Sequence, residues 1–365
     1  MRPGPALAAV LAAAAVAACS SATATAAPAG TTSAPHSPSP ARTAAPAIGA
    51  PGPVVGVNLY AVRGETAAQT AADGTRTLSY IKDTLHAGAV DLVWNMYAPA
   101  PASDSVTATA AGTLTAPDIG ILTRIAQGDG LEVEYRPLLF VQSTGDTWEG
   151  SIKPADPAAW FGGYYAANLP YLQQAQKYGI SEYVIGTEMD GVSPDPQWPS
   201  FLARAARVFT GEISYTADQV DYFPPHTQLP ATRLTGVDMY EALRLPSPVQ
   251  ASAVTAAYEK FFAALPASLL QRTAIQETGI EARAGAYGNP PNLGETGRLD
   301  ESVQVNWFTA GCEAVRKFHL RGIFFWKVDL ADSPVTHPAS SLSTFEGKAG
   351  AAAIGKCQSI IKGES

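Results

Sequence analysis

The chain has 365 residues, of which 46% are hydrophobic and 15% are charged, so it has enough apolar material for one large α/β domain or two medium-sized domains. Its formal net charge is −8 at pH 7, and the sequence contains no run of Lys or Arg. Because nucleic acids are bound by basic surfaces, this composition argues against DNA or RNA as a partner.

The first 18 residues have the features of a secretory signal peptide. Arg2 gives the positive charge, and the apolar stretch from Leu7 to Ala17 is too short to span a bilayer. The stretch ends in Val16-Ala17-Ala18-Cys19, which resembles the bacterial lipobox, a signal whose cysteine becomes the lipidated first residue of the mature protein. We therefore expect an extracellular protein that contacts the cell membrane only through a lipid on Cys19. Ordinary cleavage and secretion is the alternative.

Residues 19–52 are predicted to be a disordered tether, because they are almost entirely Ala, Ser, Thr, Pro and Gly and cannot bury enough apolar surface to fold. Residues 53–365 are predicted to form the folded domain. Two cysteines fall in that domain, Cys312 and Cys357. Outside the cell such a pair forms a disulfide, which would tie a late helix to the C-terminal helix.

Eight short runs rich in apolar, β-branched or aromatic residues are predicted to be strands, at 54–60, 90–97, 131–141, 182–188, 212–218, 233–240, 272–279 and 320–328. Most are separated by helix-like stretches, at 75–87, 116–127, 157–178, 198–210, 249–264, 301–318 and 347–361. Eight strands alternating with helices over about 310 residues are typical of a (β/α)₈ TIM barrel, an α/β fold. An open doubly wound sheet would need a Gly-rich nucleotide loop after an early strand, and the sequence has no such motif.

One crossover is predicted to be irregular. Between Asp218 and Arg233 the chain contains the segment DYFPPHTQLP, whose three prolines leave little room for a full helix. We expect a loop there with at most one helical turn. His226 lies in this segment, where it would face either the substrate or the solvent.

Polar and aromatic side chains gather at the ends of the predicted strands, which is where TIM barrels build their active sites. Aromatic rings stack on pyranose rings, and carboxylates and amides bond sugar hydroxyls, so this pattern suits a sugar-binding cleft. Trp94 and Trp148 could equally be core residues, and Arg136 could orient a carboxylate. The predicted substrate-binding residues are Asn58, Trp94, Asn95, Arg136, Trp148, Asp218, Tyr240 and Trp326.

Two glutamates stand out, Glu188 at the end of the fourth strand and Glu277 at the end of the seventh. One glutamate at a strand end is usually a solvated cap or an ion-pair partner. Strands four and seven lie across the mouth of a barrel, however, so these two side chains can face each other. Retaining glycosidases use two carboxyl groups about 5–5.5 Å apart, one as nucleophile and one as acid/base. We predict that Glu188 and Glu277 are catalytic.

These residues resemble the large clan of (β/α)₈ retaining glycosidases, and most closely glycoside hydrolase family 113, the β-mannanases. The acid/base motif of that family reads I-G-T-E, as Ile185–Glu188 does here, whereas most of the clan has Asn before the Glu. The resemblance covers residues 53–362. Its other motifs are 148–152 with Trp160, Phe161 and Tyr164, then 213–218, 236–240 and 322–326.

The resemblance implies that Glu188 is the acid/base and Glu277 the nucleophile, with Tyr240 beside the nucleophile and Trp326 under the sugar. Two positions depart from the family pattern or cannot be assigned: Asp218 stands where the family usually has Asn, and Gln276 has no evident counterpart. These two positions bear on the substrate preference and not on the reaction type.

The combined prediction is a lipid-anchored, monomeric retaining glycoside hydrolase that needs no cofactor. Its expected partner is a β-linked polysaccharide or oligosaccharide, foremost β-1,4-mannan or glucomannan. The five histidines form no zinc motif, and no G-x-S-x-G esterase motif is present. Two alternatives stay open, the same chemistry on a β-glucan or galactan, and a surface lipoprotein that binds carbohydrate without cleaving it.

Overall fold

The structure is a computed structural model that describes residues 52–61, 66–108, 112–143, 148–224, 228–245, 248–292, 296–330 and 341–364. The predicted signal peptide, the lipidation site at Cys19 and all but the last residue of the predicted tether lie outside the described residues. His226 lies outside them as well.

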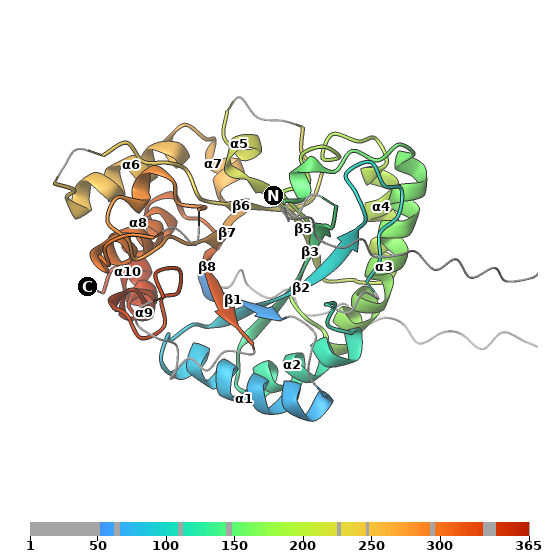
Figure 1. The fold of residues 1–365 in the computed structure, drawn as a ribbon, viewed down its shortest axis with the longest axis horizontal. Helices are drawn as coiled ribbons and strands as arrows, with labels where there is room; N and C mark the ends of the chain where they lie inside the picture. Colours follow the sequence, from blue (N-terminus) through green and yellow to red (C-terminus); the bar gives the residue numbers. More distant parts are fainter. Residues whose placement is uncertain are drawn as a thin grey trace, which may run out of the picture. The chain divides into compact units, whose positions relative to one another are not determined.

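Eight parallel strands close into a barrel in the order β1-β2-β3-β4-β5-β6-β7-β8, which confirms the predicted (β/α)₈ fold (Figure 1). The strands are β1 Val54–Ala61, β2 Ala89–Ala98, β3 Glu132–Val141, β4 Glu182–Thr187, β5 Glu212–Asp218, β6 Leu234–Asp238, β7 Thr273–Thr278 and β8 Gly322–Asp329. Each predicted strand is present, with ends that differ from the predicted ones by at most two residues.

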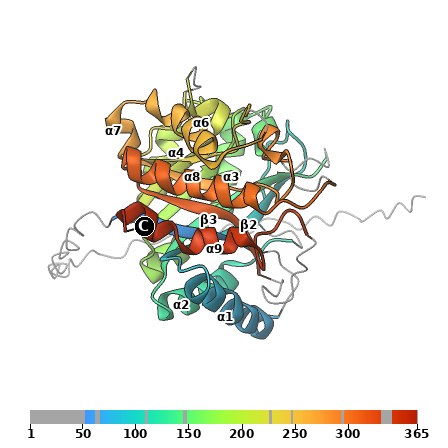
Figure 2. The same ribbon diagram turned by 90° about the vertical axis from the view of Figure 1, so that its left-hand side faces the viewer.

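Helices surround the ring of strands (Figure 1), and α8 and α9 lie side by side along one flank of the barrel (Figure 2). The helices are α1 Ala67–Asp83, α2 Ala116–Gly128, α3 Pro157–Tyr178, α4 Trp198–Ala205, α5 Gln219–Tyr222, α6 Ala251–Ala263, α7 Ala267–Leu270, α8 Ser302–Phe318, α9 Ala349–Gly355 and α10 Cys357–Lys362, with short 3-10 turns η1 Glu149–Ser151 and η2 Ala286–Gly288. In the described part of the loop predicted after β5, the only helix is the four-residue α5, as its prolines require.

Helix ends follow local capping chemistry. Asp156 accepts a hydrogen bond from the Ala159 amide and α3 begins with Pro157, whereas Gly179 ends the helix in the left-handed conformation at φ 60°. The start of α1 was predicted eight residues too late, because its first half has no apolar periodicity. Thr66 and Gln69 form a capping box that starts the helix there instead.

The residues of each strand alternate between the barrel interior and the layer under the helices. On β3, Tyr135 faces the helices, where Trp94 packs edge-on against it, while Glu134 and Arg136 lie in the interior. Most TIM-barrel interiors are filled with branched apolar side chains. Here buried charged and amide groups occupy the interior instead.

The predicted disulfide is present and joins Cys312 of α8 to Cys357 of α10. Both sulfurs are fully buried between the helices. Among the described residues, no helix has the length and apolarity that a membrane crossing requires.

Candidate active site

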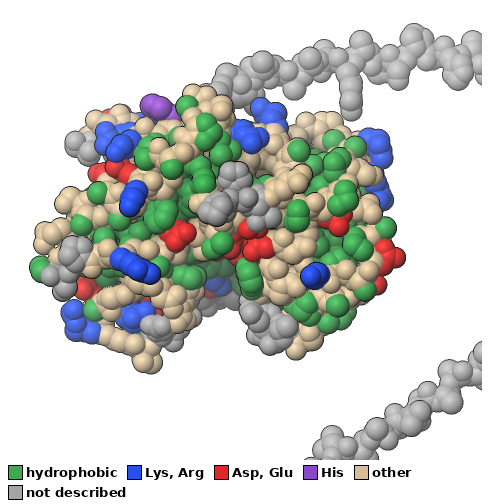
Figure 3. Space-filling model, turned by 90° about the horizontal axis from the view of Figure 1, so that it is seen from above, with side chains coloured by type: hydrophobic (Ala, Val, Ile, Leu, Met, Phe, Trp, Pro, Cys, Tyr) green, Lys and Arg blue, Asp and Glu red, His purple; other side chains and the backbone are tan. Residues whose placement is uncertain are grey.

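A cavity of about 430 Å³ opens at the C-terminal ends of the strands. It is lined by Leu138, Trp148, Glu149, Thr187, Glu188, Asp218, Gln219, Tyr240, Glu277, Pro291 and Trp326. Six of the predicted site residues are therefore brought together: Trp148, Glu188, Asp218, Tyr240, Glu277 and Trp326. A hollow of similar size beside α7 has Arg272 as its one charged residue and contains no carboxyl group, so it offers no comparable chemistry. In a view of one face of the molecule, acidic side chains gather near the middle among hydrophobic ones (Figure 3).

Glu188 is the first residue after β4 and has a left-handed backbone, with φ 45°. Its amide donates to the carbonyl of Thr216 on β5 (2.9 Å), which fixes this unusual turn. Non-glycine residues in this conformation often mark functional sites, because neighbouring contacts must hold the strain. Burial raises the pKa of the Glu188 carboxyl well above its usual range, and the charges of Asp238, Glu149 and Glu277 add to the increase. Glu188 is therefore suited to carry a proton.

Glu277, on β7, has two strong donors. The Tyr240 hydroxyl donates to Oε1 (2.5 Å), and the Arg136 guanidinium lies 3.1 Å from Oε2. Burial raises the pKa of Glu277 too, but Arg136, Tyr240 and Lys327 oppose that increase because they stabilise the ionised form. The surroundings therefore separate the pKa values of the two glutamates. Glu188 is favoured as the protonated acid, and Glu277 is supported as the ionised carboxylate.

Asp238, at the end of β6, connects them. It is fully buried and accepts from Arg136 Nη2 at 2.5 Å, and the Glu188 carboxyl also hydrogen-bonds to it. A continuous chain of contacts therefore runs from Glu188 through Asp238 and Arg136 to Glu277. The sequence placed Asp238 at a strand end but did not single it out. Asp238 could have been found from Tyr240, a predicted site residue two positions later in the same predicted strand, because residues two apart lie on the same face of a strand.

Two predicted substrate-binding residues lie beneath the cavity instead of lining it. Arg136 is fully buried and donates to Thr187 Oγ1 (3.1 Å) and to the Gln276 carbonyl (3.0 Å). Asn58 is also fully buried and donates to Asp91 Oδ2 (3.0 Å). The structure gives both a positioning role under Glu277 and no surface for a sugar.

Trp94 is on the other side of the strand and does not belong to the site. Its ring is fully buried and stacks on Tyr171 of α3, with centroids 4.5 Å apart. The prediction was wrong because Trp94 alternates with Asp91, Val93 and Asn95, which face the interior. Asn95 lies near the rim and donates to the Tyr60 hydroxyl (2.6 Å), but it does not line the cavity.

Two tryptophans give the cavity aromatic surface. Trp148, before η1, is 43% exposed, and Trp326 of β8 packs beside Tyr60 with centroids 5.9 Å apart. Lys327 lies 4.0 Å from the Tyr60 ring and pairs with Asp329 at 2.6 Å. Flat apolar rings next to hydrogen-bonding groups are what a sugar ring requires.

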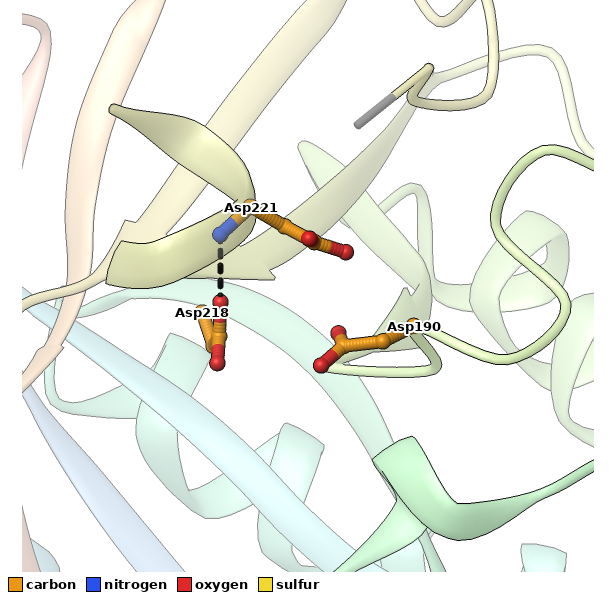
Figure 4. Close-up of side chains that lie close together, drawn as sticks. All are labelled: Asp190, Asp218 and Asp221. Atoms are coloured by element: carbon orange, nitrogen blue, oxygen red, sulfur yellow. Dashed lines mark hydrogen bonds between the residues drawn. The ribbon is translucent and has the colours of Figure 1, made fainter. Parts of the chain in front are cut away.

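Three aspartates form a carboxyl cluster at the edge of the cavity (Figure 4). Oxygens of Asp190, Asp218 and Asp221 lie within 4.8 Å of one another, and the Asp221 amide donates to Asp218 Oδ1 (2.7 Å). Burial, with Asp218 and Asp221, raises the pKa of Asp190 to about 8. A proton on Asp190 offsets the crowding of charge, and we assign no ion to the cluster.

Glu149 was not predicted as a site residue. It begins η1 and its side chain is only 7% exposed, yet it lines the cavity. No pattern in the sequence indicated it beyond its place in a family-like loop, since it does not end a strand. Gln276, whose role the sequence left open, lies inside the barrel and donates to Glu134.

A (β/α)₈ barrel whose mouth holds two electrostatically separated glutamates, a supporting tyrosine and tryptophan surfaces is the architecture of a glycoside hydrolase. The model of Glycoside Hydrolase Family 113 matches residues 56–341. The chain belongs to glycoside hydrolase family 113.

Solved structures agree with the fold. A GH113 β-1,4-mannanase in complex has a TM-score of 0.70 and 15% identity, over 84% of this chain and 98% of the other. The GH113 β-mannanase AaManA from Alicyclobacillus acidocaldarius has a TM-score of 0.70 and 17% identity, over 85% and 98%. A GH5_18 protein from Streptomyces cattleya is more distant, with a TM-score of 0.57, 16% identity, and 87% and 82% covered. No curated protein sequence matches the chain.

Proposed function

We propose that the protein is a lipid-anchored extracellular β-mannanase that cleaves β-1,4-mannan or glucomannan with retention of anomeric configuration. The observation that carries this proposal is the pairing of Glu188 and Glu277 in one cavity with different electrostatic surroundings. The choice of mannan rests on the GH113 β-mannanases that share the fold.

In the first step, a Glu277 carboxylate oxygen attacks the anomeric carbon while the Glu188 carboxyl gives its proton to the departing glycosidic oxygen. The carbon–oxygen bond to the leaving sugar breaks, and a glycosyl ester on Glu277 forms. Tyr240 and Arg136 stabilise the carboxylate before attack, each through one of its oxygens. Trp326 supplies the apolar surface beneath the sugar ring.

In the second step, Glu188 is ionised because it has given its proton away. It now takes a proton from water, whose oxygen attacks the anomeric carbon and displaces Glu277 as a carboxylate. Both residues return to their starting protonation states. Two inversions at one carbon give net retention, so the first-formed product of a β-mannan is a β-anomer.

Reducing-sugar release from mannan, glucomannan, β-glucan, xylan and galactan tests the substrate. We expect release from mannan or glucomannan, and proton NMR of early product should show the β-anomer first. Cleavage confined to glucan or galactan would replace mannan as the substrate. An α-anomer appearing first would contradict the retaining mechanism.

The anchor is tested separately in a bacterial host that processes lipoproteins. We expect the wild-type chain to incorporate an alkyne-labelled fatty acid and to sediment with membranes, and Cys19→Ala to do neither. Labelling of Cys19→Ala equal to that of the wild type would contradict the anchor. The released catalytic domain should elute as a monomer in size-exclusion chromatography.

A further inference from the structure

Glu149 is a third glutamate of the cavity, and the mechanism above does not use it. Its backbone is fixed by the η1 turn: the Ile152 amide donates to the Glu149 carbonyl (3.0 Å), and Ser151 Oγ donates to the Trp148 carbonyl (3.0 Å). The turn is also held from the side, because a Cβ on Gly191 would stand 2.0 Å from the Ile152 carbonyl oxygen. Glu149 is therefore held in place and not carried on a loose loop.

The Glu149 side chain points into the cavity. It is 7% exposed and shares the lining with Trp148, Glu188 and Glu277. When it is ionised, Glu149 raises the pKa of Glu188, and among the neighbouring charges only Asp238 has a larger effect there. It also raises the pKa of Tyr60 on β1. Glu149 thus lines the same cavity as the exposed tryptophan and the two glutamates, where the reacting sugar must bind.

Within the described part of the chain, no ion pair joins Glu149 to a cation. The guanidinium that influences it, that of Arg136, already pairs with Asp238 and Glu277. A buried carboxylate without a cation is costly, so the neutral acid is favoured. Burial raises the pKa of Glu149 well above its usual range, and the negative charge of Glu277 acts in the same direction.

A buried acid of this kind adds nothing to stability that an apolar side chain would not add. Proteins keep such groups where binding or chemistry needs them. A neutral carboxyl group has one O–H donor and a carbonyl acceptor, which together match a sugar hydroxyl.

We propose that Glu149 is a specificity-determining residue that hydrogen-bonds a hydroxyl group of the sugar ring held between Glu188 and Glu277. The inference rests on the proposed function. It predicts that the cavity rejects a sugar lacking that hydroxyl, because the buried Glu149 carboxyl would then lose a hydrogen bond inside the site.

The first experiment measures kcat and KM of Glu149→Gln and Glu149→Ala on an aryl β-mannobioside. We expect Glu149→Gln to stay within about threefold of wild type, because the amide also donates and accepts. Glu149→Ala should lose about 10- to 100-fold in kcat/KM, mostly in kcat, because the contact is made at the reacting sugar. Glu132→Ala, at the far end of β3, is the control and should match wild type.

The melting temperature separates binding from structure. Because Glu149 has no cation to lose, we expect Glu149→Ala to melt within about 2 °C of wild type or higher. A large fall in melting temperature together with equal losses in Glu149→Gln and Glu149→Ala would overturn the proposal in favour of a structural role.

The second experiment identifies the hydroxyl with 2-, 3- and 6-deoxy sugars at the reacting position. Wild type should lose at least about tenfold on one of them, whereas Glu149→Ala should not discriminate against that same sugar. If Glu149→Ala lost as much activity as the wild type on each of the three deoxy sugars, this inference would be overturned. The same holds if the wild type is active and Glu149→Ala is equally active on the unmodified substrate. Neither result would affect the proposed function. A wild type that cleaves none of the glycans would overturn the proposed function as well.

Discussion

The two halves of the barrel interior both bury charged groups, but they balance them differently. Near the N-terminal ends of the strands, Glu182 pairs with Arg321 at 2.8 Å, and Glu134 accepts from Gln276. Near the C-terminal ends, the single guanidinium of Arg136 serves Asp238 and Glu277. Arg136 therefore ion-pairs with two carboxylates, with Glu149 and Glu188 close by, whereas Arg321 ion-pairs with Glu182 alone among the described residues.

This difference separates stability from function. A paired buried charge holds the fold, and its loss leaves an uncompensated partner. A crowd of carboxyl groups around one cation costs stability but shifts pKa values, which is what acid/base chemistry needs. Substitutions near the N-terminal ends of the strands, the lower half of the barrel, should therefore change the free energy of unfolding. Substitutions near the C-terminal ends, the upper half, should change turnover.

The largest effect is expected from Glu277→Ala, which should lower kcat by about 10⁴-fold or more because no glycosyl ester can form. Its melting temperature should stay at or above that of wild type, since one crowded carboxylate is removed. Added azide should restore turnover and give an α-glycosyl azide, because azide then attacks from the side that Glu277 occupied. A β-azide would reverse the assignment of the two glutamates.

Asp238→Asn should reduce kcat by about 10²-fold, because Asp238 holds Arg136 and receives the Glu188 hydrogen bond. The Asp238 charge also raises the pKa of Glu188. Without that charge, Glu188 loses its proton at lower pH, so the alkaline limb of the kcat profile should move to lower pH.

Asp91→Asn is the matched control for this variant, since Asp91 also lies near Arg136, at 3.9 Å, but is not among the charges that act most strongly on Glu188. Its alkaline limb should stay in place. An unchanged limb in Asp238→Asn would show that the contact chain does not set the acid/base group.

Arg321→Met tests the lower half. Glu182 is 2% exposed, and losing its cation should destabilise the fold by about 2 kcal/mol, less than a fully buried pair because Arg321 is partly exposed. Denaturant unfolding measures this loss, while kcat/KM should stay within about threefold of wild type. The double variant Arg321→Met with Glu182→Leu should recover most of the stability. Lost activity with unchanged unfolding would break the division between the halves.

The same division explains what the sequence could predict. Strand ends are visible in a pattern, so Glu188, Glu277, Tyr240 and Trp326 were found at the cavity. A period of two makes neighbouring residues on a strand point apart, and the choice of face was wrong for Trp94. Glu149 comes from a loop, where no periodicity indicates direction, and only the fold shows that its carboxyl enters the cavity.

The smallest expected effect concerns the carboxyl cluster at the cavity edge, which extends the crowding of the upper half. The pKa of Asp190 is raised to about 8, against an ordinary value of 3.8. Between these two pH values the folded state holds a proton that the unfolded state has lost. The contribution of Asp190 to stability is therefore full below pH 3.8 and is lost as the pH rises toward 8.

Asp190→Asn removes this dependence, because an amide keeps its neutral form at every pH. The melting temperature of the variant relative to wild type should rise between pH 5 and pH 8, by about 1–3 °C for a partly exposed group. Thermal unfolding at several pH values measures this difference. Asp83→Asn, on the exposed end of α1, is the control and should show a constant difference. The same constant difference in Asp190→Asn would mean that the cluster does not hold its extra proton, and that the crowding of carboxyl groups ends at Glu188.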